Sequence, residues 1–253
     1  MSRTVLVTGA SGGIGRAIAA AFAAAGDRVA VHYAGNADAA TAVRAGLAGD
    51  GHLLVRADLA DPEQARELVD TVVAGAGGLD VLINNAAVGT SRATAHPVPE
   101  VSYADWQRAW RTAVDVNLIG AANLSWCAAR HMIERGRGGR IVNVGSRGAY
   151  RGEPANPAYG ATKAALHALG QSLAVSLAPH GIAVSSVAPG FVRTERQAAT
   201  LDGGPGDTIR AQSPFGRVAE PDEVAAAVLY LASADALWAS GAVLDLNGAS
   251  YLR

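Results

Sequence analysis

The sequence predicts an α/β protein built on a doubly wound parallel sheet of seven strands, with helices on both faces. Short β-branched runs alternate with longer alanine-rich segments whose apolar residues repeat with helical period. Most of the segments between the runs are long enough for the crossover helices that parallel strands require. A chain of 253 residues can bury one sizeable core, and neither a linker nor an internal repeat divides it.

Local signals place the individual elements. Gly26 follows an amphipathic run and should end the first helix, because glycine readily closes a helix. Asp61-Pro62 and Glu220-Pro221 are typical helix starts, since proline at the first helical position lacks only an N–H that would have no partner. The strands are expected at 4–8, 28–33, 53–58, 79–84, 140–146, 182–188 and 242–246.

Two long segments, 87–101 and 191–217, break the alternation. We call them the entrance loop and the lid, because long irregular segments in a compact domain usually serve function. Arg92 and His96 in the entrance loop are interpreted as solvated surface groups. The lid and the loop 145–157 should form the pocket walls, with Arg147, Tyr150, Arg151, Glu153, Phe191 and Phe215 as their larger side chains.

Composition excludes several classes of partner. With 21 basic and 22 acidic residues, the net charge of -1 provides no field to attract nucleic acid or an anionic membrane. The longest weakly apolar run, 17–25, is too short to span a bilayer, and no signal peptide is apparent, so a cytoplasmic protein is expected. The single cysteine, Cys127, excludes an intramolecular disulfide and is interpreted as a buried, inert thiol. Small molecules or copies of the same chain are the expected partners, and no metal site is predicted.

A glycine-rich segment, TGASGGIG at 8–15, follows the first predicted strand and opens the first predicted helix. Gly9, Gly13 and Gly15 lack side chains, so they allow a tight turn, close approach of a pyrophosphate and access to free N–H groups at the helix start. Ser11 and Ile14 in the same loop are further candidate contacts. This placement predicts a dinucleotide cradle, although methyltransferases that use S-adenosylmethionine also carry glycines after a first strand.

A tyrosine and a lysine form the candidate catalytic pair. Tyr159 and Lys163 lie four residues apart in a stretch of helical character, which places the phenol and the ammonium on one face. A neighbouring cation lowers the pKa of a phenol and thereby suits it to proton exchange. Ser146 closes a predicted strand at the sheet edge where ligands bind, and Asn117 interrupts an apolar stretch, where its amide can hold a water.

Together these motifs resemble the short-chain dehydrogenase/reductase family, and among its members the 3-oxoacyl-carrier-protein reductases and glucose 1-dehydrogenase-like enzymes. The resemblance covers nearly the whole chain and implies one NAD(P)-binding Rossmann domain over residues 1–253. It rests on Thr8-Gly9 with Gly13 and Gly15, Asp58, Asn84-Asn85-Ala86, Asn117, Ser146, Tyr159 with Lys163, and Pro189-Gly190 with Thr194.

The resemblance implies a role for each residue. Tyr159 would donate a proton to a carbonyl oxygen that Ser146 hydrogen-bonds. Lys163 would bind the nicotinamide ribose and lower the pKa of the tyrosine, while Asn117 would hold a water linking the lysine to a proton relay. The remaining implied cofactor contacts are Asp58 at the adenine with Leu59 after it, Asn84, Asn85 and Ala86 along the cofactor, and Pro189, Gly190, Val192 and Thr194 by the nicotinamide carboxamide.

Two departures from the family pattern concern the substrate entrance. Ala87 replaces the glycine that usually follows Asn-Asn-Ala, and the entrance loop is longer than usual. The predicted function is reduction of a ketone by NADPH to a secondary alcohol, with a 3-oxoacyl thioester among the candidate substrates. An NAD-dependent alcohol or sugar dehydrogenase working in the oxidative direction remains open. A nucleotide-binding sensor also remains, but it would give the complete set of catalytic residues no purpose.

The expected preference for NADP(H) rests on the end of the second predicted strand. An acid there would hydrogen-bond the ribose of NAD and repel a 2′-phosphate, but the strand runs into HYAGN without a carboxylate. His32, Tyr33, Asn36 and Ser11 are candidate neutral donors to the phosphate, and no arginine obviously clamps it. NAD(H) stays possible, with Asp38 or another group at its ribose.

The resemblance also implies a homotetramer or homodimer, in which the helices carrying Asn117 and Tyr159 and the C-terminal strands pair with their symmetry mates. The apolar run 242–244 agrees with such burial. A monomer in which that run is simply an internal strand would show the same pattern.

Overall fold

Seven parallel strands form one sheet in the order β3-β2-β1-β4-β5-β6-β7. This computed structural model describes residues 2–253. The predicted doubly wound fold is confirmed, and strand order reverses between β1 and β4, which creates a crevice at their carboxyl ends. The strands are β1 (Thr4–Val7), β2 (Arg28–Tyr33), β3 (Leu53–Arg56), β4 (Val81–Asn84), β5 (Gly139–Val144), β6 (Ile182–Pro189) and β7 (Val243–Leu246).

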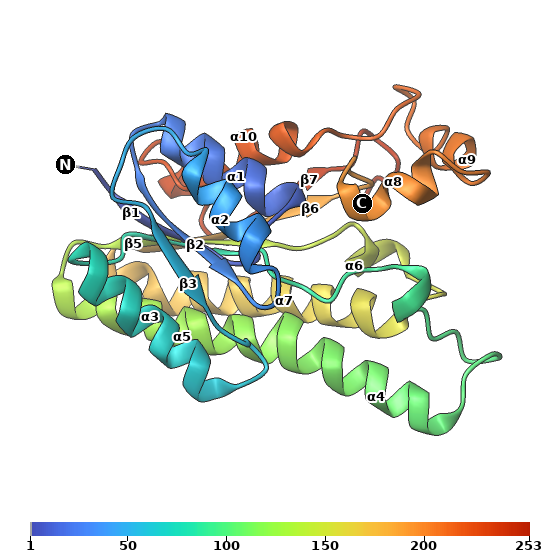
Figure 1. Cartoon of the computed structure of the whole chain (residues 1–253), viewed down its shortest axis with the longest axis horizontal. Coiled ribbons are helices and arrows are strands. Elements are labelled where there is room, and N and C mark those ends of the chain that lie inside the picture. The colour runs from blue at the N-terminus through green and yellow to red at the C-terminus, as the bar shows by residue number, and fades with distance from the viewer. Residues whose placement is uncertain (1) are drawn as a thin grey trace.

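Helices cover both faces of the sheet (Figure 1). One face carries α1 (Gly13–Ala24), α2 (Ala37–Ala45) and α10 (Pro221–Leu231). The other carries α3 (Pro62–Ala76), α4 (Tyr103–Val114), α5 (Ala121–Arg135) and α7 (Pro157–Leu177). The shorter elements are α6 (Gly148–Arg151), α8 (Glu195–Leu201), α9 (Gly206–Arg210), three 3-10 turns (Arg92–Thr94, Ala178–His180 and Leu237–Ala239) and a π-helical turn (Asp115–Gly120).

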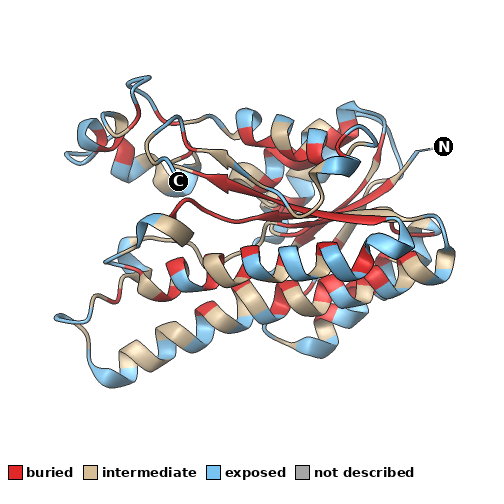
Figure 2. Ribbon diagram, turned by 180° about the vertical axis from the view of Figure 1, so that it is seen from behind, coloured by how far each residue is buried: buried red, intermediate tan, exposed pale blue. Residues whose placement is uncertain are grey.

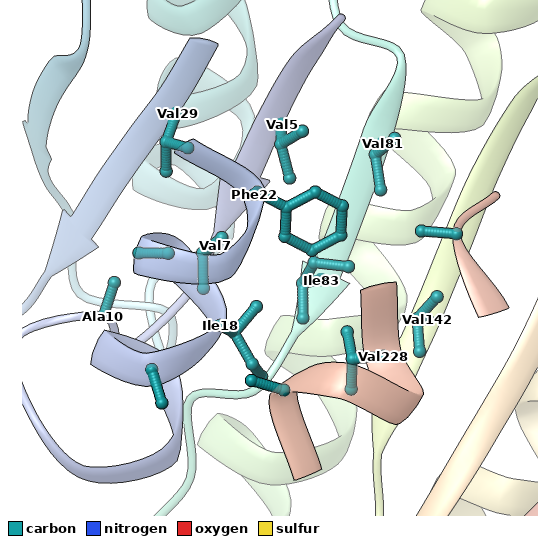
Figure 3. Packing of buried hydrophobic residues seen from close by; sticks show 14 of the residues in the cluster. Val5, Val7, Ala10, Ile18, Phe22, Val29, Val81, Ile83, Val142 and Val228 are labelled. Atoms are coloured by element: carbon teal, nitrogen blue, oxygen red, sulfur yellow. The ribbon is translucent and has the colours of Figure 1, made fainter. Parts of the chain in front are cut away.

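Alternation along the strands divides the core into two layers. Val5 and Val7 of β1 pack with Phe22 of α1 and Val228 of α10, as Figure 3 shows, whereas Leu6 between them belongs to the layer under α3 and α5. This follows from the two-residue period of a strand, which sends successive side chains to opposite faces. The strands at the centre of the sheet are therefore buried on both sides (Figure 2).

The predicted helix boundaries are confirmed by their capping contacts. Asp61 accepts hydrogen bonds from the N–H groups of Glu63 and Gln64 at the start of α3. Glu220 caps α10 in a reciprocal arrangement with the third residue of that helix. Gly26, with a φ of +87°, closes the turn between α1 and β2.

Two expectations about the long segments are wrong. The lid is not irregular throughout, because it contains two short helices, α8 and α9, on either side of its glycine-rich break. Helices of 7 and 5 residues are too short to show a full amphipathic repeat. His96 is buried rather than solvated, because the entrance loop folds back onto the start of α7, while Arg92 is exposed as expected. Figure 1 shows the lid, the entrance loop and the start of α4 at the same end of the molecule.

Cys127 is half-buried rather than buried as expected, and this partial burial raises the pKa of its thiol, which agrees with an unreactive side chain. No helix between residues 2 and 253 is both long and apolar enough to cross a membrane. Over that same range, no three His, Cys, Asp or Glu side chains are grouped so that they could hold a metal ion.

Candidate active site

A cavity of about 790 Å³ follows the carboxyl ends of the strands and joins the glycine loop to the candidate catalytic residues. The chain brings most of the predicted site residues together there. Those that line it are Gly9, Ser11, Gly13, Ile14, Gly15, His32, Asn36, Asp58, Leu59, Asn85, Ala86, Ser146, Tyr159, Lys163, Pro189, Gly190, Val192 and Thr194. Tyr33, Asn84 and Asn117 are not among the lining residues.

The glycine loop has the geometry of a dinucleotide cradle. Gly9 and Gly13 adopt φ values of +64° and +53°, which residues with side chains rarely adopt. A Cβ at Gly15 would lie 2.3 Å from the carbonyl oxygen of Gly9 and 2.6 Å from Nδ2 of Asn85, so no side chain fits there. Asn85 donates through Nδ2 to the Thr8 carbonyl at 2.8 Å, which ties the loop to the end of β4. A pyrophosphate can thus approach the backbone at the start of α1, and these residues fit NAD(P).

The lid closes directly over this cradle. The carboxylate of Glu195, the first residue of α8, accepts a hydrogen bond from the N–H of Gly13 at 3.1 Å and pairs with Arg16. The neighbouring lid residues Arg196 and Gln197 also line the cavity. None of these four was predicted as a site residue. Arg16 could have been found from its place in the first turn of α1, but nothing local indicates that the lid folds back on the loop.

At the other end of the cavity, Ser146 is oriented by the backbone. Its Oγ accepts a hydrogen bond from the N–H of Gly148 at 3.0 Å, which leaves the hydroxyl hydrogen available to donate. Burial raises the pKa of Tyr159, and the nearby Glu153 carboxylate acts in the same direction, while the hydrogen bond with Ser146 and the charge of Arg196 oppose the change. Tyr159 is therefore a protonated phenol at neutral pH.

Lys163 does not have the predicted effect on the pKa of Tyr159. Its Nζ donates to the carbonyl oxygen of Val144 at 2.7 Å and lies 5.8 Å from the centroid of the Tyr159 ring. Burial lowers the pKa of Lys163 to about 8. The sequence predicted that this ammonium lowers the pKa of Tyr159. In the protein without a cofactor the pKa of Tyr159 is instead raised, because burial is the largest effect on it.

Asn117 lies in the π-helical turn that interrupts the α4–α5 helix, a distortion often found at functional sites. Its Oδ1 accepts from the N–H of Val88 at 2.7 Å, and its Nδ2 donates to the Val88 carbonyl and to Oγ1 of Thr162, both at 3.2 Å. The amide hydrogens are thus already used within the protein. The side chain joins the start of the entrance loop to α7, and the second lone pair of Oδ1 is the group through which it can hold a water.

The predicted role of His32 at a 2′-phosphate is wrong. Its Nδ1 accepts from the N–H of Gly9 at 3.0 Å, and its Nε2 donates to the Ala57 carbonyl at 3.1 Å, so no N–H remains for a ligand. Burial lowers its pKa to about 4, which keeps the ring neutral. His32 lines the cavity together with Ala34, Gly35 and Asn36, and the Asn36 side chain caps α2.

The predicted pocket walls are partly confirmed. Arg147, Glu153 and Phe191 line the main cavity, but Tyr150, Arg151 and Phe215 do not. Phe215 instead borders a second cavity of about 320 Å³ between the lid and the C-terminal segment. Arg147 and Phe191 line both cavities and therefore lie between them.

Comparison with known proteins gives matches over almost the entire chain. A family model described as enoyl-(acyl carrier protein) reductase matches residues 9–248. An L-rhamnose 1-dehydrogenase (NAD(P)(+)) from a Sphingomonas species is 38% identical, covering 99% of this chain and 97% of the relative. An acetoacetyl-CoA reductase from Shinella zoogloeoides is 36% identical, covering 99% of each. The crystal structure of a short chain dehydrogenase from Burkholderia cenocepacia in complex with NADP has a TM-score of 0.87 and 36% identity, covering 98% of this chain and 97% of that one.

Proposed function

The chain belongs to the short-chain dehydrogenase/reductase family, and from this premise we propose that it reduces a ketone to a secondary alcohol with NADPH, with Tyr159 as the general acid. The family assignment makes it an NAD(P)-dependent oxidoreductase that acts on carbonyl or alcohol groups. One observation carries the proposal: the hydroxyl groups of Ser146 and Tyr159, with the amine of Lys163, share a single cavity with a glycine cradle shaped for a dinucleotide.

The chain's own residues position the carbonyl and supply the proton. The hydroxyl of Ser146 donates a hydrogen bond to the carbonyl oxygen, and Tyr159 transfers its phenolic proton to that oxygen as the C=O bond becomes a C–O–H group. When bound, NADPH would supply the hydride that the carbonyl carbon receives. The raised pKa of Tyr159 supports the reductive direction, because a protonated phenol is the form that donates.

Three observations support a preference for NADP(H). Ala34, Gly35 and Asn36 place no carboxylate where it would repel a 2′-phosphate. Arg16 lines the cavity, and Nε of Arg56 donates to the Ala34 carbonyl at 3.2 Å, which brings two cations to this region. The Burkholderia neighbour was solved with NADP, whereas the name of the Sphingomonas relative gives either cofactor.

Gly35 provides the test of this preference. A Cβ at this position meets no atom within 4 Å, so a side chain can be added without strain. Gly35→Asp should shift the ratio of kcat/KM for NADPH over NADH toward NADH by about tenfold or more, through repulsion of the 2′-phosphate. Gly35→Asn is the matched neutral control and should leave the ratio nearly unchanged. Equal ratios for the two variants would show that this segment does not select the cofactor.

A second candidate function is oxidation of a sugar or another polyol. Glu153 lines the cavity close to Tyr159, and its carboxylate can accept hydrogen bonds from substrate hydroxyl groups. The Sphingomonas relative is named for a sugar substrate, and the Shinella relative for a 3-oxoacyl thioester. Absorbance of the nicotinamide, followed in both directions with ketones, 3-oxoacyl thioesters and sugars, distinguishes the two. Turnover of sugars alone would overturn the proposed reductase.

We further propose that the enzyme is a homodimer or homotetramer. Trp126 on α5 and Val175 on α7 are 64% and 79% exposed, and Leu244 lies on β7, the last strand of the sheet. Large apolar side chains and an unpaired strand edge on the surface of one chain favour burial against a second copy.

A further inference from the structure

Arg147 is a buried cation beside the reaction centre. It follows Ser146 directly in the chain, is only 5% exposed, and lies between the main cavity and the smaller one under the lid. Its guanidinium stacks over the ring of Phe191 with 5.2 Å between Cζ and the ring centroid. Arginine is rarely buried to this extent without a partner, because removal of a charge from water is costly.

The protein partners of this guanidinium are neutral. Nη1 donates to Oγ of Ser250, and Nη2 donates to Oε1 of Gln212 at 2.5 Å. Gln212 Oε1 also accepts from Arg151 at 2.6 Å, so one amide oxygen is shared by two cations. Across residues 2–253, Arg147 forms no ion pair, and two of the five N–H groups of a guanidinium have an identified acceptor.

The surrounding charges compensate Arg147 only in part. Lys163 and Arg196 line the same cavity together with the carboxylates of Glu153 and Glu195. Glu195 pairs with Arg16, whereas no ion pair within residues 2–253 joins Glu153 to Arg147, Lys163 or Arg196. Burial lowers the pKa of Arg147 and the charge of Arg151 lowers it further, while the Glu153 carboxylate opposes the change. This end of the cavity therefore has an excess of positive charge in a poorly solvated place, which attracts an anion.

We propose that Arg147 binds a carboxylate of the substrate, so that the enzyme acts on an oxo acid whose carbonyl lies at Ser146 and Tyr159. Two of its N–H groups donate to Ser250 and Gln212, and the other three have no identified acceptor in the described part of the chain and can donate to the oxygens of a carboxylate. The inference rests on the proposed function, since it places the reacting carbonyl in the same cavity. It adds the substrate class, which the catalytic residues alone do not determine.

The test compares acids with their neutral esters. NADPH oxidation is measured with 2-oxo, 3-oxo and 4-oxo acids of four or five carbons, each beside its methyl ester. At least one acid should have a higher kcat/KM than its ester. Arg147→Gln should lower the kcat/KM of that acid about 10- to 100-fold, which is the range for hydrogen bonds to charged groups. The kcat/KM of the matching ester should change less than about threefold. Arg151→Gln is the matched control, because it removes an exposed cation that shares Gln212 and should leave the acid's advantage intact.

A failure of the proposed function can be told apart from a failure of this inference. If neither acids nor esters are turned over, the reductase proposal fails. The carboxylate site at Arg147 is then tested by calorimetry, which measures binding of each acid and its ester to the NADP⁺-loaded protein. The inference is supported if an acid binds while its ester does not, and if Arg147→Gln abolishes the binding of that acid. Equal turnover or equal binding of acid and ester would overturn the inference. An Arg147→Gln variant that weakens both alike would also overturn it, provided that its affinity for the cofactor shows that the variant is folded.

Discussion

At the residue scale, burial shifts the two candidate catalytic groups toward their neutral forms. The pKa of Tyr159 is raised, and that of Lys163 is lowered to about 8. Both groups keep their protons at pH 7, so the lysine is a cation and the tyrosine is an acid. The state of each is thus determined by desolvation, and the i, i+4 spacing serves mainly to bring them to one cavity.

Tyr159→Phe should lower kcat by about 10²- to 10⁴-fold, because it removes the proton donor and little else. The affinity for NADPH, measured by fluorescence titration, should remain close to that of the native protein. Lys163→Ala is the comparison, and it should weaken both turnover and cofactor binding because the resemblance assigns it both roles. A folded Tyr159→Phe protein with near-native turnover would contradict the mechanism.

His32 should make folding sensitive to acid. Its pKa falls from 6.5 to about 4 on burial, so the unfolded chain takes up a proton between these values while the folded one does not. The free energy of unfolding should therefore decrease as the pH falls from 6.5 to 4, by about 3 kcal/mol for a fully expressed shift of this size. His167, whose pKa is also lowered to about 4, acts in the same direction.

The measurement is urea unfolding at pH 7 and pH 4.5 for the native protein and for His32→Asn. Asparagine can still accept the hydrogen bond from Gly9 but does not titrate in this range. The variant should lose less stability in acid than the native protein. An identical loss in both would show that His32 is not responsible.

At the element scale, the entrance loop is joined to the helix that carries the catalytic pair. Nε2 of His96 accepts from the N–H of Ala158 at 3.2 Å, and the backbone N–H of His96 donates to Ala155 at 2.8 Å. The ring also packs edge-on against Trp106, with centroids 5.8 Å apart. The first N–H groups of a helix have no partner within it, so His96 caps α7 by accepting from the N–H of Ala158, the residue before Tyr159.

Replacement of His96 separates this capping function from simple packing. His96→Ala should destabilise the protein by about 1–2 kcal/mol, as loss of a helix cap does, and should lower kcat more than it raises KM. His96→Gln retains an acceptor near the position of Nε2 and should recover most of the loss. Unfolding by urea and steady-state kinetics check both variants, and an alanine variant equal to the glutamine variant would exclude the capping role.

At the scale of the whole molecule, the proposed oligomer provides the remaining prediction. Light scattering at micromolar concentration should give a particle of two or four chains rather than the 25.6 kDa of one. Trp126→Lys should shift the particle toward the monomer, because it places a charge in the proposed contact. Val98→Lys, an equally exposed position in the entrance loop, is the control. A native particle of one chain would contradict the proposal.

The sequence by itself determined the features that depend on neighbouring residues. The strand pattern and the helix caps follow from local periodicity and capping chemistry, and the cradle from three glycines between a strand and a helix. The position of Ser146 at a strand end and the pairing of Tyr159 with Lys163 follow from their elements in the same way. These predictions did not require knowledge of which helices and strands pack against each other.

Only the tertiary structure decided how deeply each side chain is buried and which distant segments touch. It turned His32 and His96 from expected surface or ligand groups into buried hydrogen-bonding residues, and it brought Glu195 onto the cradle. It also placed Arg147 between two cavities with neutral partners more than 60 residues away in the chain. The physical reason is that desolvation and charge compensation depend on contacts between remote segments, to which local sequence patterns are blind.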